Sequence, residues 1–127
     1  MPELHVELVT ADRQVWSGQA RIVVAKTVEG YFGMLPGHAP VLAVLANGVV
    51  TVRTVDGEDV YAAVLGGFIS VADDDVSILA EHAELASEVD IAHAREELER
   101  LQGFEDPESV EARSRAIARI RAVEQAG

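Results

Sequence analysis

The chain has 127 residues, no cysteine and a formal net charge of −12 at pH 7. The absence of cysteine excludes disulfides and thiolate metal sites, and the acidic balance argues against nucleic-acid binding, because a surface that neutralises phosphates must be basic. No apolar run approaches the roughly twenty residues that span a bilayer, so we expect membrane association only through partners, and the polar first residues predict no signal peptide.

Residues 1–87 carry the hydrophobic pattern of short β-strands. Apolar residues there alternate with polar ones or run together over about four to eight positions, and turn-forming residues separate the runs. The predicted strands are residues 4–8, 21–26, 41–45, 49–55, 60–65, 68–71 and 76–80. The dipeptide Asp56-Gly57 predicts a hairpin between two of them, since both residues tolerate positive φ. This spacing is typical of a small sandwich or barrel.

The hydrophobic period becomes helical after Ser87. Asp90 is a suitable N-cap for a first helix, and Gly103 is placed to end it. Asp106 followed by Pro107 marks the start of a second helix. The expected apolar positions are Ile91, Ala94, Leu98 and Leu101 in the first helix and Val110, Ile117, Ile120 and Val123 in the second. We therefore predict two domains, a β-domain at 1–87 and an antiparallel helical hairpin at 88–127 that must dock on something to bury its apolar stripe.

Charge is distributed unevenly within the predicted hairpin. Residues 90–111 contain two arginines and eight acidic residues, whereas residues 112–127 carry a net charge of +3. The basic side chains of this tail are Arg113, Arg115, Arg119 and Arg121. We expect them to pair with an acidic surface, which is either the preceding helix or a partner protein.

The sequence gives little support for an enzyme. Gly66-Gly67-Phe68 lacks the Lys-Ser/Thr that completes a phosphate-binding loop. The four histidines have no metal-ligand spacing, and no serine lies in a nucleophile elbow.

Two motifs carry a resemblance to a known family. The strings GMLPGHAPVLAVL at 33–45 and AVLGGFISVADDDVSILAEHAE at 63–84 closely resemble the epsilon subunit of the bacterial F-type ATP synthase. The resemblance runs from Leu4 to the C-terminal helix. It implies an N-terminal β-sandwich of about ten strands followed by a C-terminal antiparallel two-helix hairpin.

The resemblance also implies a function. Family members are non-catalytic rotor subunits of the central stalk. They bind the gamma subunit and the c-subunit ring, couple proton flow to ATP synthesis by the alpha and beta subunits, and inhibit ATP hydrolysis through the C-terminal helices. The implied location is peripheral, at the cytoplasmic face of the cell membrane.

Contact residues are carried over from the family by position. Glu29, Tyr31, Phe32 and His38 fall in a loop region where members touch gamma and the c ring. Many members have an acidic residue where this chain has Tyr31, so Tyr31 and Phe32 are either an interface anchor or a cover for the end of the sandwich. His38 is either a structural turn residue or a contact residue. Arg113, Arg115, Arg119 and Arg121 are implied contacts for the catalytic beta subunit.

Some family members bind ATP on the folded hairpin, and part of that pattern is present here. The matching residues are Glu84, Asp90, Ala94, Arg100, Arg115 and Arg119, with His93 in place of an arginine. Arg115 and Arg119 share a helix face, where they are placed either to clamp a triphosphate or to pair with Glu96 and Glu99. No cofactor is required, and ATP is the candidate regulatory ligand. The alternative function is a free-standing ATP sensor, a ligand-binding β-sandwich with a helical lid.

Overall fold

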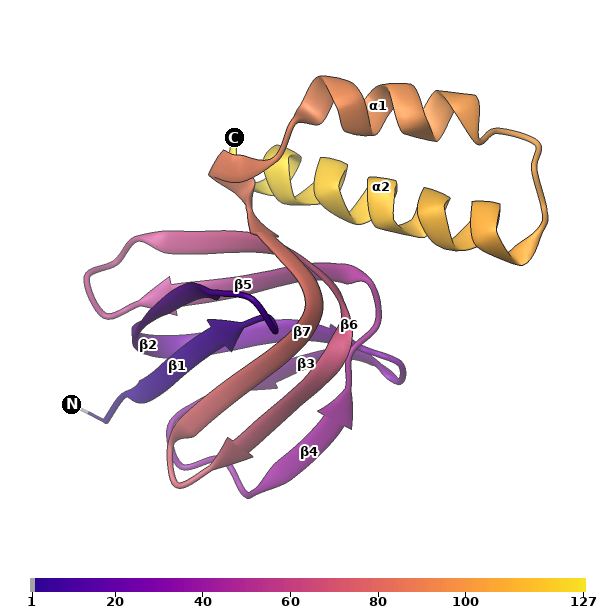
Figure 1. The fold of residues 1–127 in the computed structure, drawn as a ribbon. Coiled ribbons are helices and arrows are strands. Elements are labelled where there is room, and N and C mark those ends of the chain that lie inside the picture. Colours follow the sequence, from indigo (N-terminus) through magenta and orange to yellow (C-terminus); the bar gives the residue numbers. More distant parts are fainter. Residues whose placement is uncertain (1) are drawn as a thin grey trace.

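In the computed structural model, which describes residues 2–127, a β-domain is followed by a helical hairpin (Figure 1). The strands are β1 (Leu4–Val9), β2 (Gln14–Thr27), β3 (Gly30–Met34), β4 (Val41–Val44), β5 (Gly48–Thr54), β6 (Asp59–Ala72) and β7 (Asp75–Leu85). A short 3-10 helix, η1 (Ala86–Glu88), leads to the helices α1 (Ile91–Arg100) and α2 (Pro107–Ala126).

The strands form a sheet that closes on itself. Strand β1 pairs antiparallel with β2 and parallel with β7, and the circuit is completed through β6 and β5 back to β2. Strand β3 extends the sheet beside β2, and β4 pairs with β6. This is the predicted β-sandwich, in the form of a flattened barrel followed by two helices.

The pair Gly66-Gly67 forms a corner in the long strand β6. Before this corner β6 pairs with β5, from Asp59 to Val64, and after it the same edge pairs with β4, from Phe68 to Val71. Both glycines have positive φ, 76° and 114°. A Cβ on Gly67 would lie 2.0 Å from the carbonyl oxygen of Leu79 on the adjacent strand, so only glycine fits.

The core of the β-domain is built by the strands alone. Its largest fully buried side chains include Leu4, Met34, Ile69 and Ile78, which alternate with more exposed residues along their strands. The main apolar cluster contains no residue of α1 or α2. The helices therefore cover the β-domain without completing its core.

Helix α2 lies between α1 and the sandwich (Figure 1). Both predicted N-caps are confirmed, since the Asp90 carboxylate accepts from His93 N at 3.0 Å and the Asp106 carboxylate accepts from Ser109 N at 3.1 Å. The Asp56-Gly57 hairpin between β5 and β6 is also confirmed.

The strands differ from the prediction in three respects. The described residues 2–127 form seven strands rather than about ten, because residues 60–65 and 68–71 belong to one strand and β2 extends back to Gln14. Residues 30–33, expected in a loop, belong to strand β3, since pairing with β2 overrides the turn-like glycines at its first and fourth positions.

The buried face of α2 also differs from the predicted stripe. Ala116, Ala118 and Ala122 are buried, whereas Val110 is 41% exposed. Small side chains allow the helix to approach both α1 and the sandwich closely, so alanine occupies the contact positions while larger residues lie at the edges.

Candidate functional site

The connection between β2 and β3 is a tight turn that displays its side chains. The buried Thr27 hydroxyl donates to the carbonyl of Gly30 at 2.8 Å and accepts from Glu29 N at 3.2 Å. Val28 is 66% exposed and Glu29 is also exposed. The turn is therefore held by its own hydroxyl and leaves both tip residues available for a partner.

The four residues predicted to contact gamma and the c ring lie on two different surfaces. Tyr31 and Phe32 are consecutive on β3, so their side chains point to opposite faces of the sheet. Tyr31 is exposed and lines a pocket beside α2. Phe32 instead packs against the core and meets His38 edge to face, with ring centroids 5.2 Å apart. Glu29 lies with Tyr31 at the start of β3, whereas His38 follows the end of that strand.

The turn at 33–40 is tied to the β6–β7 turn. Gly37 has a φ of 86°, and its N–H donates to Asp74 Oδ1 at 2.7 Å. His38 donates from Nδ1 to the carbonyl of Ala39 at 2.7 Å. The histidine is thus held by both a backbone acceptor and the Phe32 ring, which fits a structural role in the turn.

A row of apolar side chains, three of them exposed and the fourth, Val9, partly buried, crosses four strands and was not predicted. Across the sheet, Val44 of β4 lies opposite Phe68 of β6, and Phe68 lies opposite Leu79 of β7. Leu79 in turn lies opposite Val9 of β1. Val44, Phe68 and Leu79 are 46%, 50% and 55% exposed, and Leu42, on the same side of β4 as Val44, is 71% exposed. We call Val9, Val44, Phe68 and Leu79 the apolar row.

A hollow of about 290 Å³ adjoins the apolar row and includes Phe68, Leu79 and Gly67 in its lining. A contiguous apolar surface on a small protein marks an interaction site more often than scattered apolar residues do. The available sequence signal was that apolar residues are adjacent, Phe68 to Ile69 and Ile78 to Leu79. Because neighbouring residues of a strand point to opposite faces, both faces of these strands are apolar.

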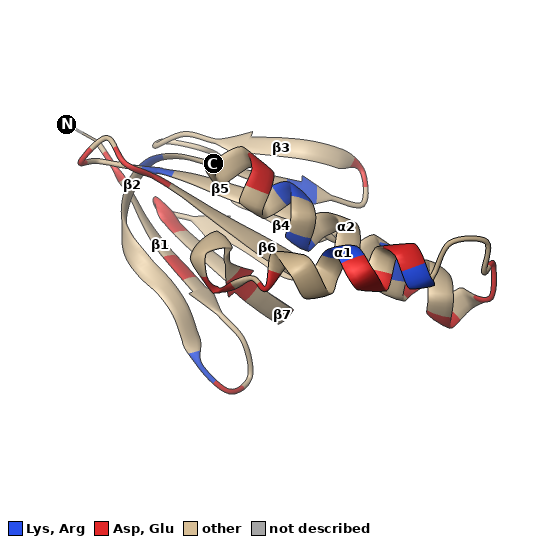
Figure 2. Cartoon of the chain, turned by 90° about the horizontal axis from the view of Figure 1, so that it is seen from above, with Lys and Arg blue, Asp and Glu red and all other residues tan. Residues whose placement is uncertain are grey.

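Two arginines of α2 pair with glutamates of β7. Arg119 Nε lies 2.5 Å from Glu84 Oε1, and an Arg115 nitrogen lies 3.6 Å from Glu81 Oε2. Arg115 also donates to Glu111 within α2 at 3.1 Å. Figure 2 shows basic segments of α2 above the strands and acidic segments at the connection between the helices.

These pairs correct the predicted partners of the basic tail. Glu96 and Glu99, which lie on α1, are not the partners of Arg115 and Arg119; the acidic strand β7 supplies them instead. The reason is that α2 turns this basic face toward the sandwich and a different face toward α1.

The other two arginines of the tail have different surroundings. Arg113 donates to the carbonyls of Leu101 and Phe104 at 3.1 and 2.9 Å, and so fixes α2 to the end of α1. Arg121 is exposed and lines the pocket between α2 and the sandwich. A further link across the interface is the Asn47 amide, which donates to Glu111 at 2.9 Å and to Ser114 at 3.2 Å.

The residues that match the family's nucleotide pattern are only partly brought together. Glu84 of β7 lies close to Arg115 and Arg119 of α2, where the helix faces that strand. Asp90 caps the start of α1 and Arg100 ends it, about 15 Å away at the usual helical rise. Ala94 is buried. His93, which stands in place of an arginine of the pattern, has its Nε2 3.4 Å from Glu97 Oε2.

A bidentate ion pair holds the segment that joins the two domains. The two terminal guanidinium nitrogens of Arg13 each donate to an oxygen of the Glu88 carboxylate at 2.9 Å. The same carboxylate also accepts from Leu85 N at 2.9 Å. The Arg13 hydrogen bonds, followed by that from Leu85, lower the pKa of Glu88 from 4.5 to about 2. The domain junction is thereby fixed to the β1–β2 turn.

Residues 2–127 contain no group of three or more His, Asp or Glu side chains arranged to bind a metal ion. Neither described helix is both long enough and apolar enough to cross a membrane.

Comparisons with known proteins agree on one family. The family model for the β-sandwich domain of ATP synthase delta/epsilon chains matches residues 3–86. The ATP synthase epsilon chain of Streptomyces avermitilis is 59% identical over 121 residues, covering 95% of each chain. That of Rhodococcus jostii is 48% identical over 127 residues, covering 99% of this chain and 100% of the relative.

Two solved structures share the fold. A chain of the Euglena gracilis mitochondrial ATP synthase, solved with OSCP, F1 and the c-ring, matches 98% of this chain and 79% of its own length, with a TM-score of 0.75 and 22% identity. A chain from the Tetrahymena thermophila mitochondrial ATP synthase central stalk and c-ring matches 97% and 95%, with a TM-score of 0.58 and 18% identity. At these identities the likeness concerns the fold alone.

Proposed function

This chain belongs to the ATP synthase epsilon-chain family, and on that premise we propose that it is a rotor subunit of the central stalk. In this role the sandwich binds the gamma subunit and rests on the c-subunit ring, so that rotation driven by proton flow reaches the alpha and beta subunits. The chain contributes no catalytic site of its own. It lies at the cytoplasmic face of the membrane and is attached only through these partners.

The observation that carries this proposal is the apolar row. A side chain that is half exposed in the free protein gains about 25 cal/mol for each Å² of apolar surface that a partner covers. The row crosses β4, β6, β7 and β1, and so offers a continuous strip rather than separate contacts. We assign this strip to gamma, because a subunit that transmits torque needs a broad and permanent attachment to the shaft.

The predicted contact residues fit this arrangement in two groups. Glu29 and Tyr31 form part of an exposed surface at the β2–β3 turn and are retained as candidate contacts with gamma or the c ring. Phe32 and His38 support the neighbouring turn from within, and we assign them the role of positioning it.

The helical hairpin is proposed to inhibit ATP hydrolysis when it leaves the sandwich. In the docked form Arg115 and Arg119 are occupied by Glu81 and Glu84, so they are unavailable to the beta subunit. The docked interface has a small apolar centre, which Ala122 forms with Val49 and Ala63. Two dockings of similar free energy are what a switch requires.

ATP is proposed as a weak regulatory ligand of the docked hairpin. The support is that Arg115 and Arg119 lie one helical turn apart beside Glu84. His93 lacks the fixed charged fork of arginine. We therefore expect His93→Arg to tighten ATP binding measured by titration calorimetry.

The rotor role is tested by binding of the full chain to purified gamma. Phe68→Ser and Leu79→Ser each remove an exposed apolar side chain from the row and should weaken binding by about tenfold or more while leaving the unfolding temperature close to that of the wild type. Val55→Ser is the matched control, because Val55 is 41% exposed at the β5–β6 turn, outside the row. Equal binding by all four proteins would contradict the assignment. Failure of the wild type to bind gamma, together with tight binding of ATP, would favour the free-standing sensor.

A further inference from the structure

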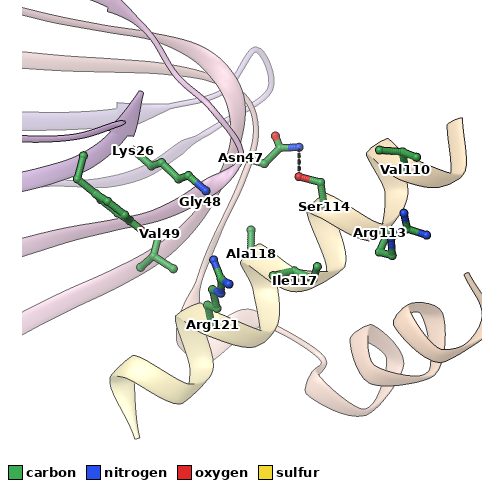
Figure 3. Close-up of a pocket in the computed structure, with 11 residues that line it drawn as sticks. Lys26, Asn47, Gly48, Val49, Val110, Arg113, Ser114, Ile117, Ala118 and Arg121 are labelled. Atoms are coloured by element: carbon green, nitrogen blue, oxygen red, sulfur yellow. Dashed lines mark hydrogen bonds between the residues drawn. The ribbon is translucent and has the colours of Figure 1, made fainter. Parts of the chain in front are cut away.

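A second cavity lies on the opposite side of α2 from the Arg–Glu pairs. It has a volume of about 290 Å³ and lies between α2 and strands β2, β3 and β5 (Figure 3). Its polar lining residues are Lys26, Tyr31, Asn47, Arg113, Ser114 and Arg121. Three of these side chains are cationic and none of the lining residues is acidic, although the chain carries a net charge of −12.

Two of the cations have no carboxylate partner. Within residues 2–127, neither Lys26 nor Arg121 forms an ion pair, whereas Arg115 and Arg119 of the same helix are both paired with glutamates. The third cation, Arg113, donates to backbone carbonyls and also lies 3.6 Å from a carboxylate oxygen of Glu105. Figure 3 shows Lys26 extending from the sheet and Arg121 from the helix toward the space between them.

Lys26 occupies space that is open because residue 48 is glycine. A Cβ on Gly48 would lie 2.8 Å from both Cβ and Cδ of Lys26, closer than real contacts allow. Gly48 has no positive φ that would require glycine for backbone reasons. Its role is therefore to let the Lys26 stem lie flat across the start of β5, which directs the ammonium group toward α2.

We propose that this cavity binds an oxyanion of the phosphate class between Lys26 and Arg121. The cavity volume, about 290 Å³, is slightly below the range of about 300 to 1,000 Å³ typical of ligand sites, which suits inorganic phosphate or the terminal phosphates of a nucleotide. Arg121 supplies a planar fork of donors and Lys26 a point charge, which is the usual combination at phosphate sites. This site is separate from the face of Arg115 and Arg119.

Because the two cations come from different domains, the bound anion would join them. Lys26 belongs to the sandwich and Arg121 to the hairpin, so the complete site exists only when the hairpin is docked. A ligand that binds one state alone stabilises that state in proportion to its concentration above Kd. Phosphate would therefore favour the docked hairpin. This consequence rests on the docked and released states proposed above, whereas the binding itself does not.

The test is a titration of the full chain with inorganic phosphate at constant ionic strength. We expect saturable binding by the wild type, and affinity reduced about tenfold or more in Lys26→Met and in Arg121→Gln, since each loses a charge-assisted contact. Arg95→Gln is the control, because it removes an exposed arginine of α1 and should leave the affinity unchanged. Gly48→Ala should weaken binding by displacing the Lys26 stem. Absence of saturable binding, or equal affinity in all these proteins, would overturn the proposal.

Two further measurements give the source of the anion and its effect. If the same variants weaken ATP binding, the terminal phosphates of a nucleotide occupy the cavity; if they weaken phosphate binding alone, free phosphate does. Hydrogen exchange of the α2 amides should slow on addition of phosphate in the wild type and remain unchanged in Arg121→Gln. Loss of phosphate binding in these experiments would leave the gamma-binding test at Phe68 and Leu79 unaffected, so failure of the two proposals can be told apart.

Discussion

Arg119 of α2 and Glu84 of β7 join the hairpin to the sandwich through an ion pair whose Nε and Oε1 atoms are 2.5 Å apart. Both side chains remain about one-third exposed, at 30% and 32%, so water screens the attraction. Pairs of this kind contribute roughly 0 to 1 kcal/mol each. This pair therefore adds little to the free energy that holds the hairpin on the sandwich.

Removing this pair should loosen the hairpin without unfolding the sandwich. We expect Arg119→Ala to raise the population of the released hairpin by up to about fivefold, equivalent to at most about 1 kcal/mol. The measurement is hydrogen exchange of α2 amides, with Glu84→Ala and the double variant completing a cycle. Arg95→Ala, on the exposed face of α1, is the control. Additive effects of the two single changes would show that the ion pair does not couple them.

A larger side chain at the centre of the interface should release the hairpin more strongly. Ala122 is fully buried against Val49 and Ala63, so Ala122→Leu overpacks the contact by about 1 to 3 kcal/mol. We expect faster proteolysis of α2 in the isolated protein and stronger inhibition of ATP hydrolysis in the assembled enzyme. Ala92→Leu, at an exposed position of α1, should change neither. Release of α2 without any change in hydrolysis would disprove the inhibitory role while leaving the docking intact as a structural finding.

Acid should weaken the domain junction through Glu88. Its folded pKa, about 2, lies below the unfolded value of 4.5, so its contribution to stability is present above about pH 4.5 and is lost as pH falls toward 2. The side chain is 37% exposed, so the contribution stays below about 1 kcal/mol. Urea unfolding of the wild type and Glu88→Gln should therefore differ at neutral pH and converge by about pH 2. Glu58→Gln, at an exposed turn, should show no such convergence, and a constant difference for Glu88→Gln would contradict the assignment.

The corner of β6 should not accept a side chain. The comparison is Gly57→Ala, in the turn between β5 and β6. It places a Cβ in open space at a φ of 90°, so we expect a cost of about 1 to 2 kcal/mol for the backbone conformation alone. Gly67→Ala adds a collision with the Leu79 carbonyl and should cost more than about 3 kcal/mol. Denaturant unfolding of both variants measures the difference. Similar costs would mean that the corner relaxes easily.

The β-domain is predicted to fold on its own. Its main cluster runs from Leu4 to Ala83 and contains no residue of α1 or α2, with the Leu85 side chain packed against it. A fragment of residues 1–87 should unfold cooperatively and bind gamma through the apolar row. A fragment that lacks a cooperative transition would show that α2 is part of the folding unit.

The sequence predicted most elements because their patterns are local. Asp90 and Asp106 marked both helix starts, and Asp56-Gly57 marked a hairpin, since capping and turn chemistry depend on neighbouring residues. Strand β3 was missed because Gly30 and Gly33 resemble loop residues until β2 is available to pair with them.

The functional surfaces were less predictable because they depend on tertiary arrangement. Phe68 and Leu79 were predicted only as parts of two strands, and their register across the sheet places them together on the outside. For Arg119 the sequence offered Glu96 and Glu99 as acidic partners. Its pairing with Glu84 became evident only from the orientation of α2.

The parallel pairing of β1 with β7 has a consequence for synthesis on the ribosome. His5 lies opposite Asp75, so the first strand finds this neighbour only after 70 further residues have been added. At about 5 to 20 residues per second, that takes several seconds, during which one edge of β1 and much of its apolar face have no permanent partner. The nascent chain is therefore most exposed to aggregation and to chaperones just before β7 emerges, and slow codons upstream of β7 would lengthen that interval.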